Sequence, residues 1–166
     1  GSYNVAISYD SLGSNTTASN NTGVGYNTLA GNTTGTPNTA IGYQALTANT
    51  TGVDNTAVGF DALKTNITTS ANTAFGSEAL RANVANNNTA IGNEAMYGNT
   101  SGASCTAVGA LALDAINTGA ENTAIGYAAL TTNTSGAANT AVGSAALVSN
   151  SSGNYNVGIG YQALEQ

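Results

Sequence analysis

The 166-residue sequence has no histidine, a single cysteine and two basic residues, Lys64 and Arg81. The lack of histidine removes the side chain that most often serves as a general base. Neither Cys105 nor any serine lies in a nucleophile-elbow sequence, so the sequence predicts a protein that is not an enzyme. Two basic side chains cannot neutralise a phosphate backbone, and we therefore expect no nucleic-acid partner. A single cysteine excludes a disulfide within the chain.

Long apolar runs and charged residues are also scarce. No apolar run approaches the roughly 20 residues that a membrane-spanning helix needs, and no signal peptide is visible, so we expect no membrane insertion. Only 6% of the residues are charged, against about 25% in typical domains. The dipeptide Asn-Gly, the strongest signal for a two-residue hairpin, is absent, and this disfavours an antiparallel meander.

The sequence consists instead of one repeated phrase, Asn-Thr-Ala-Ile-Gly-Tyr-Gln-Ala-Leu at residues 38–46, and the spacers between its copies. The copies are separated by 17 residues in eight of nine steps and by 16 residues in the step from Asn72 to Asn88. A strict short period predicts a solenoid in which each repeat forms one coil. The ten copies begin at Asn4, Asn21, Asn38, Asn55, Asn72, Asn88, Cys105, Asn122, Asn139 and Asn156.

Each copy contains a short strand pattern followed by a turn. Thr or Val alternates with an apolar residue around a position that is always Ala or Gly, and this period of two predicts a strand with one buried face. The aromatic residue and the Leu that follow are three apart, which favours a short helical turn, with a second short strand as the alternative. The predicted fold is an all-β parallel solenoid with possible helical turns. Its predicted core is Ile7, Leu12, Val24, Leu29, Ile41, Leu46, Val58, Leu63, Phe75, Leu80, Ile91, Met96, Val108, Leu113, Ile125, Leu130, Val142, Leu147, Ile159 and Leu164.

The position between the two alternating residues predicts a close neighbour. It is small in all ten copies, which indicates that another backbone lies against it. A thin coil with few large side chains gains little burial against its ordering entropy. We therefore expect several chains to pack together through this Ala/Gly stripe. The opening Gly1-Ser2 is typical of a cloning scar, and residues 3–166 are predicted to form a single repeat domain from a longer fibre protein.

The phrases Tyr3-Asn4-Val5-Ala6-Ile7-Ser8 and Tyr155-Asn156-Val157-Gly158-Ile159-Gly160 resemble the short repeat of trimeric autotransporter adhesin heads of the YadA type. The full nine-residue phrase resembles arrays in bacterial and phage fibre proteins. This resemblance implies a left-handed, homotrimeric β-roll outside the cell, at a bacterial surface or in a phage fibre, with a role in adhesion. The period here is longer than in adhesin heads, and no stalk, membrane anchor or chaperone segment is present in this sequence.

Two sets of side chains are candidate sites, each with a structural alternative. Carboxylates recur at one repeat position as Asp10, Asp61, Glu78 and Glu94; they suggest a paired-carboxylate glycosidase site or, as we favour, a solvated edge. They lack the spacing of a metal site, and no cofactor is expected. The aromatic position could bind a glycan or a peptide receptor, or could form a ladder over the Leu row. The aromatic candidates are Tyr9, Tyr26, Tyr43, Phe60, Tyr127 and Tyr161.

The recurrent Thr suggests a different class of function. Flat, regular Thr arrays on solenoids resemble ice-binding faces, although paired Thr-x-Thr rows occur here only in the spacer. We expect a structural or adhesive module of a trimeric fibre. A carbohydrate-binding adhesin that uses Tyr and Asn/Thr rows is the first alternative, and an ice-binding solenoid is the second. The ladder comprises Thr22, Thr39, Thr56, Thr73, Thr89, Thr106, Thr123 and Thr140.

Overall fold

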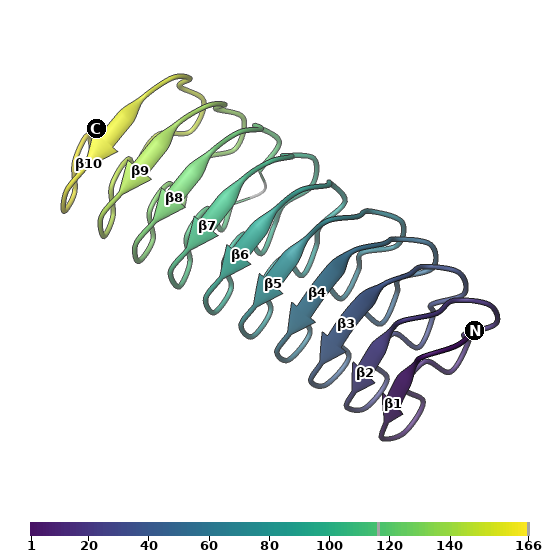
Figure 1. Cartoon of the computed structure of the whole chain (residues 1–166). Coiled ribbons are helices and arrows are strands. Elements are labelled where there is room, and N and C mark those ends of the chain that lie inside the picture. Colours follow the sequence, from purple (N-terminus) through teal and green to yellow (C-terminus); the bar gives the residue numbers. More distant parts are fainter. Residues whose placement is uncertain (116, 166) are drawn as a thin grey trace.

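The computed structural model describes residues 1–115 and 117–165. Each copy of the phrase contributes one strand, and the ten strands form a single parallel sheet in the order of the chain (Figure 1). The predicted all-β solenoid is thereby confirmed. The strands are β1 (Val5–Ile7), β2 (Thr22–Val24), β3 (Asn38–Ile41), β4 (Asn55–Val58), β5 (Thr73–Phe75), β6 (Thr89–Ile91), β7 (Thr106–Val108), β8 (Thr123–Ile125), β9 (Thr140–Val142) and β10 (Val157–Ile159).

Equivalent positions of successive coils pair with one another. Thr39 lies opposite Thr56 and Ile41 opposite Val58 in the ladder between β3 and β4, and the same register holds from β1 to β10. Each residue type therefore forms a row along the solenoid, with the two termini at opposite ends (Figure 1). In the described residues, no helix is long and apolar enough to cross a membrane.

The small residue of each strand, and not the large one, points into the coil. From Ala40 to Ala141, the Ala at this position is completely buried in every coil, whereas the Ile, Val or Phe that follows it faces outward. The interior is too narrow for more than a methyl group at this position. A Cβ built on Gly158 would lie 3.0 Å from Cγ of Leu147, on the opposite wall of the coil below.

Half of the predicted core is therefore wrong, because alternation identifies two faces but not which of them is inside. The residues that face outward are Ile7, Val24, Ile41, Val58, Phe75, Ile91, Val108, Ile125, Val142 and Ile159, which we name the Ile/Val row; several of them are 39–69% exposed. The expectation that the Ala/Gly stripe contacts other chains is also wrong. The backbone close to that stripe belongs to the chain's own coil.

The Leu of each copy does form the core. Leu29, Leu46 and the matching residues up to Leu147 are buried, with Met96 taking the same place in the sixth coil. Leu164 lies in the last coil and is more than half exposed. Together with the Ala that precedes each Leu, these side chains form the apolar half of the interior.

The segment after each strand is a tight turn and contains no helix, so the expected helical turn is wrong. Gly42 has φ +128°, and both Gln44 and Leu46 adopt left-handed values near +50°. The same pattern recurs in nearly every coil. A helical turn requires consecutive right-handed residues, and the alternation of hands turns the chain back sharply instead.

Two rows of Asn fill the polar half of the interior. In the inner Asn row, which begins each copy, the backbone N–H of Asn38 donates to Oδ1 of Asn21 at 2.8 Å, and Nδ2 of Asn38 donates to the Gly52 carbonyl at 2.8 Å. In the spacer Asn row, Nδ2 of Asn49 donates to the same Gly52 carbonyl at 3.1 Å. These side-chain amides form hydrogen bonds with buried backbone groups that are not paired in the strand ladders.

Both irregular repeats keep the spacer Asn inside the coil. In the short coil, Nδ2 of Asn83 donates to the carbonyl of Ala85, two residues on, instead of three as in the other coils. In the seventh coil, Asn117 arrives one residue late and is still completely buried, and its Oδ1 accepts from Asn133. The turn that follows Asn83 or Asn117 thus accommodates the missing or displaced residue.

Candidate interaction surface

The outward side of the sheet forms a continuous strip, which we name the outer strip. It consists of the Ile/Val row and, beside it, the Thr ladder, with Val5 and Val157 at the Thr position of the two outermost coils. Side chains at both positions point away from the coil because each is directly adjacent in sequence to the buried Ala, and successive residues of a strand face opposite sides. The Thr side chains are mostly half-buried, and Ile41 and Ile91 are about two-fifths exposed.

The outer strip is long, narrow and free of charge. Nine strand spacings of about 4.8 Å make it roughly 43 Å long, and strands of three residues make it about 10 Å wide. None of the ten Asp, Glu, Lys and Arg residues occurs at its positions. An exposed apolar patch of several hundred Å² that lacks charged residues is typical of an interaction surface.

The hydroxyl groups of the Thr ladder make no hydrogen bonds within the described residues. By contrast, spacer hydroxyls bond to the next coil, as Oγ1 of Thr33 does to the Thr50 carbonyl at 3.1 Å. The ladder hydroxyls therefore remain free to bond to water or to another molecule. The outer strip thus presents one row of apolar side chains beside one row of hydroxyl groups.

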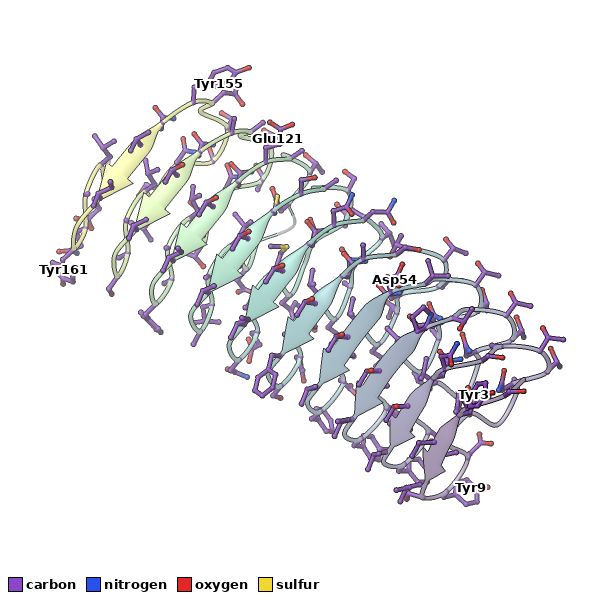
Figure 2. All side chains as sticks on the ribbon, viewed as in Figure 1. Tyr3, Tyr9, Asp54, Glu121, Tyr155 and Tyr161 are labelled. Atoms are coloured by element: carbon purple, nitrogen blue, oxygen red, sulfur yellow. The ribbon has the colours of Figure 1, made fainter. Side chains whose placement is uncertain are left out.

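The aromatic candidates of the first four coils are brought together. Tyr9, Tyr26, Tyr43 and Phe60 stack with ring centroids 5.2–5.4 Å apart and planes within 8–12° of parallel. The aromatic position lies along the edge at which the strands end, where Figure 2 shows Tyr9 and Tyr161 at the two extremes. Tyr127 is exposed and separated from that stack by three coils.

Stacking leaves few ring faces for a ligand. Each inner ring of the stack covers the faces of its neighbours, so that mainly edges and hydroxyl groups remain exposed. A sugar ring packs against the flat face of an aromatic side chain, and within the stack only the outer faces of Tyr9 and Phe60, at its two ends, have no ring over them. This geometry favours the ladder alternative over the glycan-binding one.

The Asn rows lie inside the coils and cannot contact a large ligand. Asn32, Asn49 and Asn133 each begin an Asn-x-Thr/Ser sequence, yet all three are completely buried and bonded to neighbouring backbone or Asn groups. Their recurrence is explained by the hydrogen-bonding ladder. Ligand binding through Asn therefore has no support at these positions.

The recurrent carboxylates do not converge on a site. Asp10 is exposed and Glu78 and Glu94 are half-buried, as expected for a solvated edge. Asp61 departs from that expectation, because it is buried and pairs with Nζ of Lys64 at 2.8 Å and Nε of Arg81 at 3.6 Å. The two basic residues of the chain are thus engaged with one carboxylate.

Arg81 also connects that cluster to the next coil. Its guanidinium donates to the Tyr97 hydroxyl at 2.9 Å and lies over the Tyr97 ring. The pKa of Asp114 in the seventh coil is raised, first by burial and then by repulsion from Glu94. These charges lie on the turn side of the coils and contribute nothing to the outer strip.

Cys105 occupies the inner Asn row and is buried. Burial raises the pKa of its thiol, although hydrogen bonds from its surroundings oppose the shift. A buried thiol with a raised pKa is a poor nucleophile. Residues 1–115 and 117–165 contain no pocket and no group of three or more metal-ligating His, Cys, Asp or Glu side chains.

Comparison with known proteins adds no relative to this geometry. The chain matches no protein-family model, no curated protein and no solved structure.

Proposed function

We propose that this chain is a non-enzymatic structural module of an extracellular trimeric fibre, in which three copies pack side by side through their outer strips. The observation that supports this most is the Ile/Val row, which runs outward along all ten strands. Such a rod holds a recognition element away from a bacterial surface or a phage particle, and it contributes to recognition of a receptor or glycan.

Burial of the outer strip supplies the energy for this association. Each exposed Ile or Val that leaves water contributes about 25 cal/mol per Å² of apolar surface, and the strip offers such a residue in every coil. No charged group has to be desolvated there. Three narrow strips around one axis bring all three Ile/Val rows together, while the spacers and their polar residues stay at the periphery. The left-handed winding implied by the resemblance remains part of this proposal.

Paired substitutions in a single coil test this proposal. We predict that Ile91→Asp converts the assembled species to a monomer, because it places a carboxylate at the centre of the packed strips. The monomer itself should tolerate the change, since Ile91 is exposed in a single chain. The control is Ser101→Asp, which adds the same charge on the far, exposed side of the same coil.

Mass by light scattering and β-structure by circular dichroism are the readouts for both variants. We expect Ser101→Asp to keep the parent mass and Ile91→Asp to lose two-thirds of it, with unchanged β-structure in both. An Ile91→Asp variant that keeps the parent mass would show that the outer strip is not the interface.

Ice binding through the outer strip is the second candidate, and the unengaged Thr hydroxyls favour it. A flat array with one Thr per coil, spaced by about 4.8 Å, could order water into a lattice. This function needs the strip exposed, so it excludes the packed trimer. Measurement of thermal hysteresis on the Ile91→Asp variant and on the parent separates the two: activity in a monomeric parent would support ice binding.

A further inference from the structure

The aromatic position is interrupted in the middle of the solenoid. The first four coils carry a ring there, whereas the fifth, sixth and seventh carry Ser77, Asn93 and Ala110. Tyr43 stacks on one face of Phe60, so the face of Phe60 toward the fifth coil has no ring over it. We propose that a neutral pyranose ring of a glycan stacks on this face, at the level where the next aromatic ring is missing.

The spacing of the coils suits a single ring at this level. Ring centroids in the stack lie 5.2–5.4 Å apart, close to the ~4.8 Å separation of neighbouring strands. A further ring on Phe60 therefore lies beside Ser77, whose short, exposed side chain leaves that place open. A pyranose has about the dimensions of a phenyl ring, and its C–H groups pack against the electron-rich face of an aromatic side chain.

Polar groups beside this position favour a sugar over an aromatic side chain of a partner protein. The Ser77 hydroxyl makes no hydrogen bond within the described residues. Asn93 is exposed, and its Nδ2 donates to the Ser77 carbonyl at 3.4 Å, which leaves its Oδ1 free to accept a sugar hydroxyl. An aromatic side chain would displace water from these groups without replacing the lost hydrogen bonds.

Tyr127 is the other aromatic side chain with open faces in the inner coils. The neighbouring coils carry Ala110 and Ser144 at its position, so neither of its faces is covered by a ring. No side-chain amide occurs at that position in either neighbouring coil. The Phe60 face thus combines an open ring with more hydrogen-bonding groups, and we assign the sugar to it.

The charges of the neighbouring residues select a neutral sugar. Glu78 and Glu94 directly follow the two polar residues of the site, and neither forms an ion pair within the described residues. Both basic side chains of the chain are engaged with Asp61. An acidic sugar would therefore meet unpaired carboxylates in a chain whose net charge is −6, and like charges disfavour such a complex.

This inference rests on the proposed function, because it names the place and the class of the glycan that the rod recognises. The site itself lies within one chain and does not need the packing of the outer strips. The described residues contain no pocket, so a sugar contacts one exposed ring and few polar groups. We expect a dissociation constant on the order of 1 mM for a free sugar, strengthened in a fibre by the simultaneous use of several copies.

The test is a titration of the full chain with sugars, followed by saturation-transfer NMR. The probes are cellotetraose and lactose, which are neutral, and tetragalacturonate, which is acidic; we expect the acidic probe to bind about tenfold more weakly or less. Ser77→Tyr supplies the missing ring and should weaken binding of the neutral probes by about tenfold or more. Since the preceding coils carry rings at that position, the fold should persist. Ser144→Tyr, the same change at the same position of the ninth coil, is the matched control and should bind like the parent.

Several outcomes would overturn this assignment. They are a parent that binds neither neutral probe, a Ser77→Tyr variant that binds like the parent, and loss of binding in Ser144→Tyr alone, which would place the sugar at Tyr127. Binding of p-cresol, the side chain of tyrosine, without binding of either neutral sugar would assign the position to a protein partner instead.

Mass by light scattering on the same samples separates this inference from the fibre proposal. We expect Ser77→Tyr to keep the parent mass while it loses the sugar. A trimeric parent that binds no neutral sugar would overturn the glycan site alone. A monomeric parent that binds sugar at Phe60 would overturn the fibre alone.

Discussion

At the scale of single residues, Asp114 shows how a charge behaves in a coil that offers it little solvation. Its pKa is raised by burial and by the Glu94 carboxylate. The folded chain thus holds the Asp114 proton more tightly than the unfolded chain does. By linkage, this group favours the fold fully below the unfolded pKa of about 3.9. That contribution is lost as the pH rises through the folded pKa.

We therefore predict that Asp114→Asn raises the melting temperature at pH 7 and that its advantage disappears near pH 3. Thermal melts of both proteins at the two pH values check this. Glu121→Gln, at an exposed position at the end of the same coil, is the control and should show a smaller effect. A stabilisation by Asp114→Asn that is the same at both pH values would contradict the assigned cause.

At the scale of the coil, the inner Asn row determines how one repeat is held on the next. Each Asn accepts the backbone N–H of the following Asn, as Asn38 does for Asn55 at 3.0 Å. Cys105 interrupts this row. It still donates its own N–H to Asn88 at 2.9 Å and its thiol to the Gly119 carbonyl, but it has no amide oxygen to accept the N–H of Asn122.

Cys105→Asn should therefore complete the row and stabilise the fold. One added buried hydrogen bond contributes about 1 kcal/mol, which corresponds to a rise of about 2–4 °C in melting temperature for a chain of this size. Thermal melts of the parent, Cys105→Asn and Cys105→Ala check this. Since alanine also removes the thiol without adding an acceptor, a stabilisation shared by both variants would point to another cause.

The coil also shows how far the sequence predicts its own structure. The period predicted the parallel stack, and the spacing placed Leu46 and its equivalents in the core. The direction of Ile41 and Ala40 was not predictable, because the size of the cavity depends on the opposite wall of the coil. Left-handed Gln44 and Leu46 were also missed, since the usual signals for that conformation are Gly and Asn.

At the scale of the candidate site, the sequence named the right rows but not their surroundings. Tyr9 to Phe60 were identified as a row, and only the structure shows that their faces cover one another. The Thr ladder was recognised, while its partner, the outward Ile/Val row, was assigned to the interior. The signal that could have corrected this is the smallness of the Ala/Gly position in all ten copies, which is equally consistent with a narrow interior.

At the scale of the whole molecule, the solenoid is a rod with one uncharged, apolar side and a polar, variable periphery. Its coils are held together by interior amides and backbone ladders, which repeat without depending on a globular core. The simplest way to bury an apolar strip along the full length of such a rod is to pack it against the strips of other rods.

The absolute mass in solution tests the central claim most directly. We would measure it by light scattering during size-exclusion chromatography on the parent chain over a range of concentrations. The account predicts a species of three times the 16.2 kDa chain mass. A folded species of 16.2 kDa at all concentrations would contradict it, since the outer strip would then be exposed to solvent in the working protein.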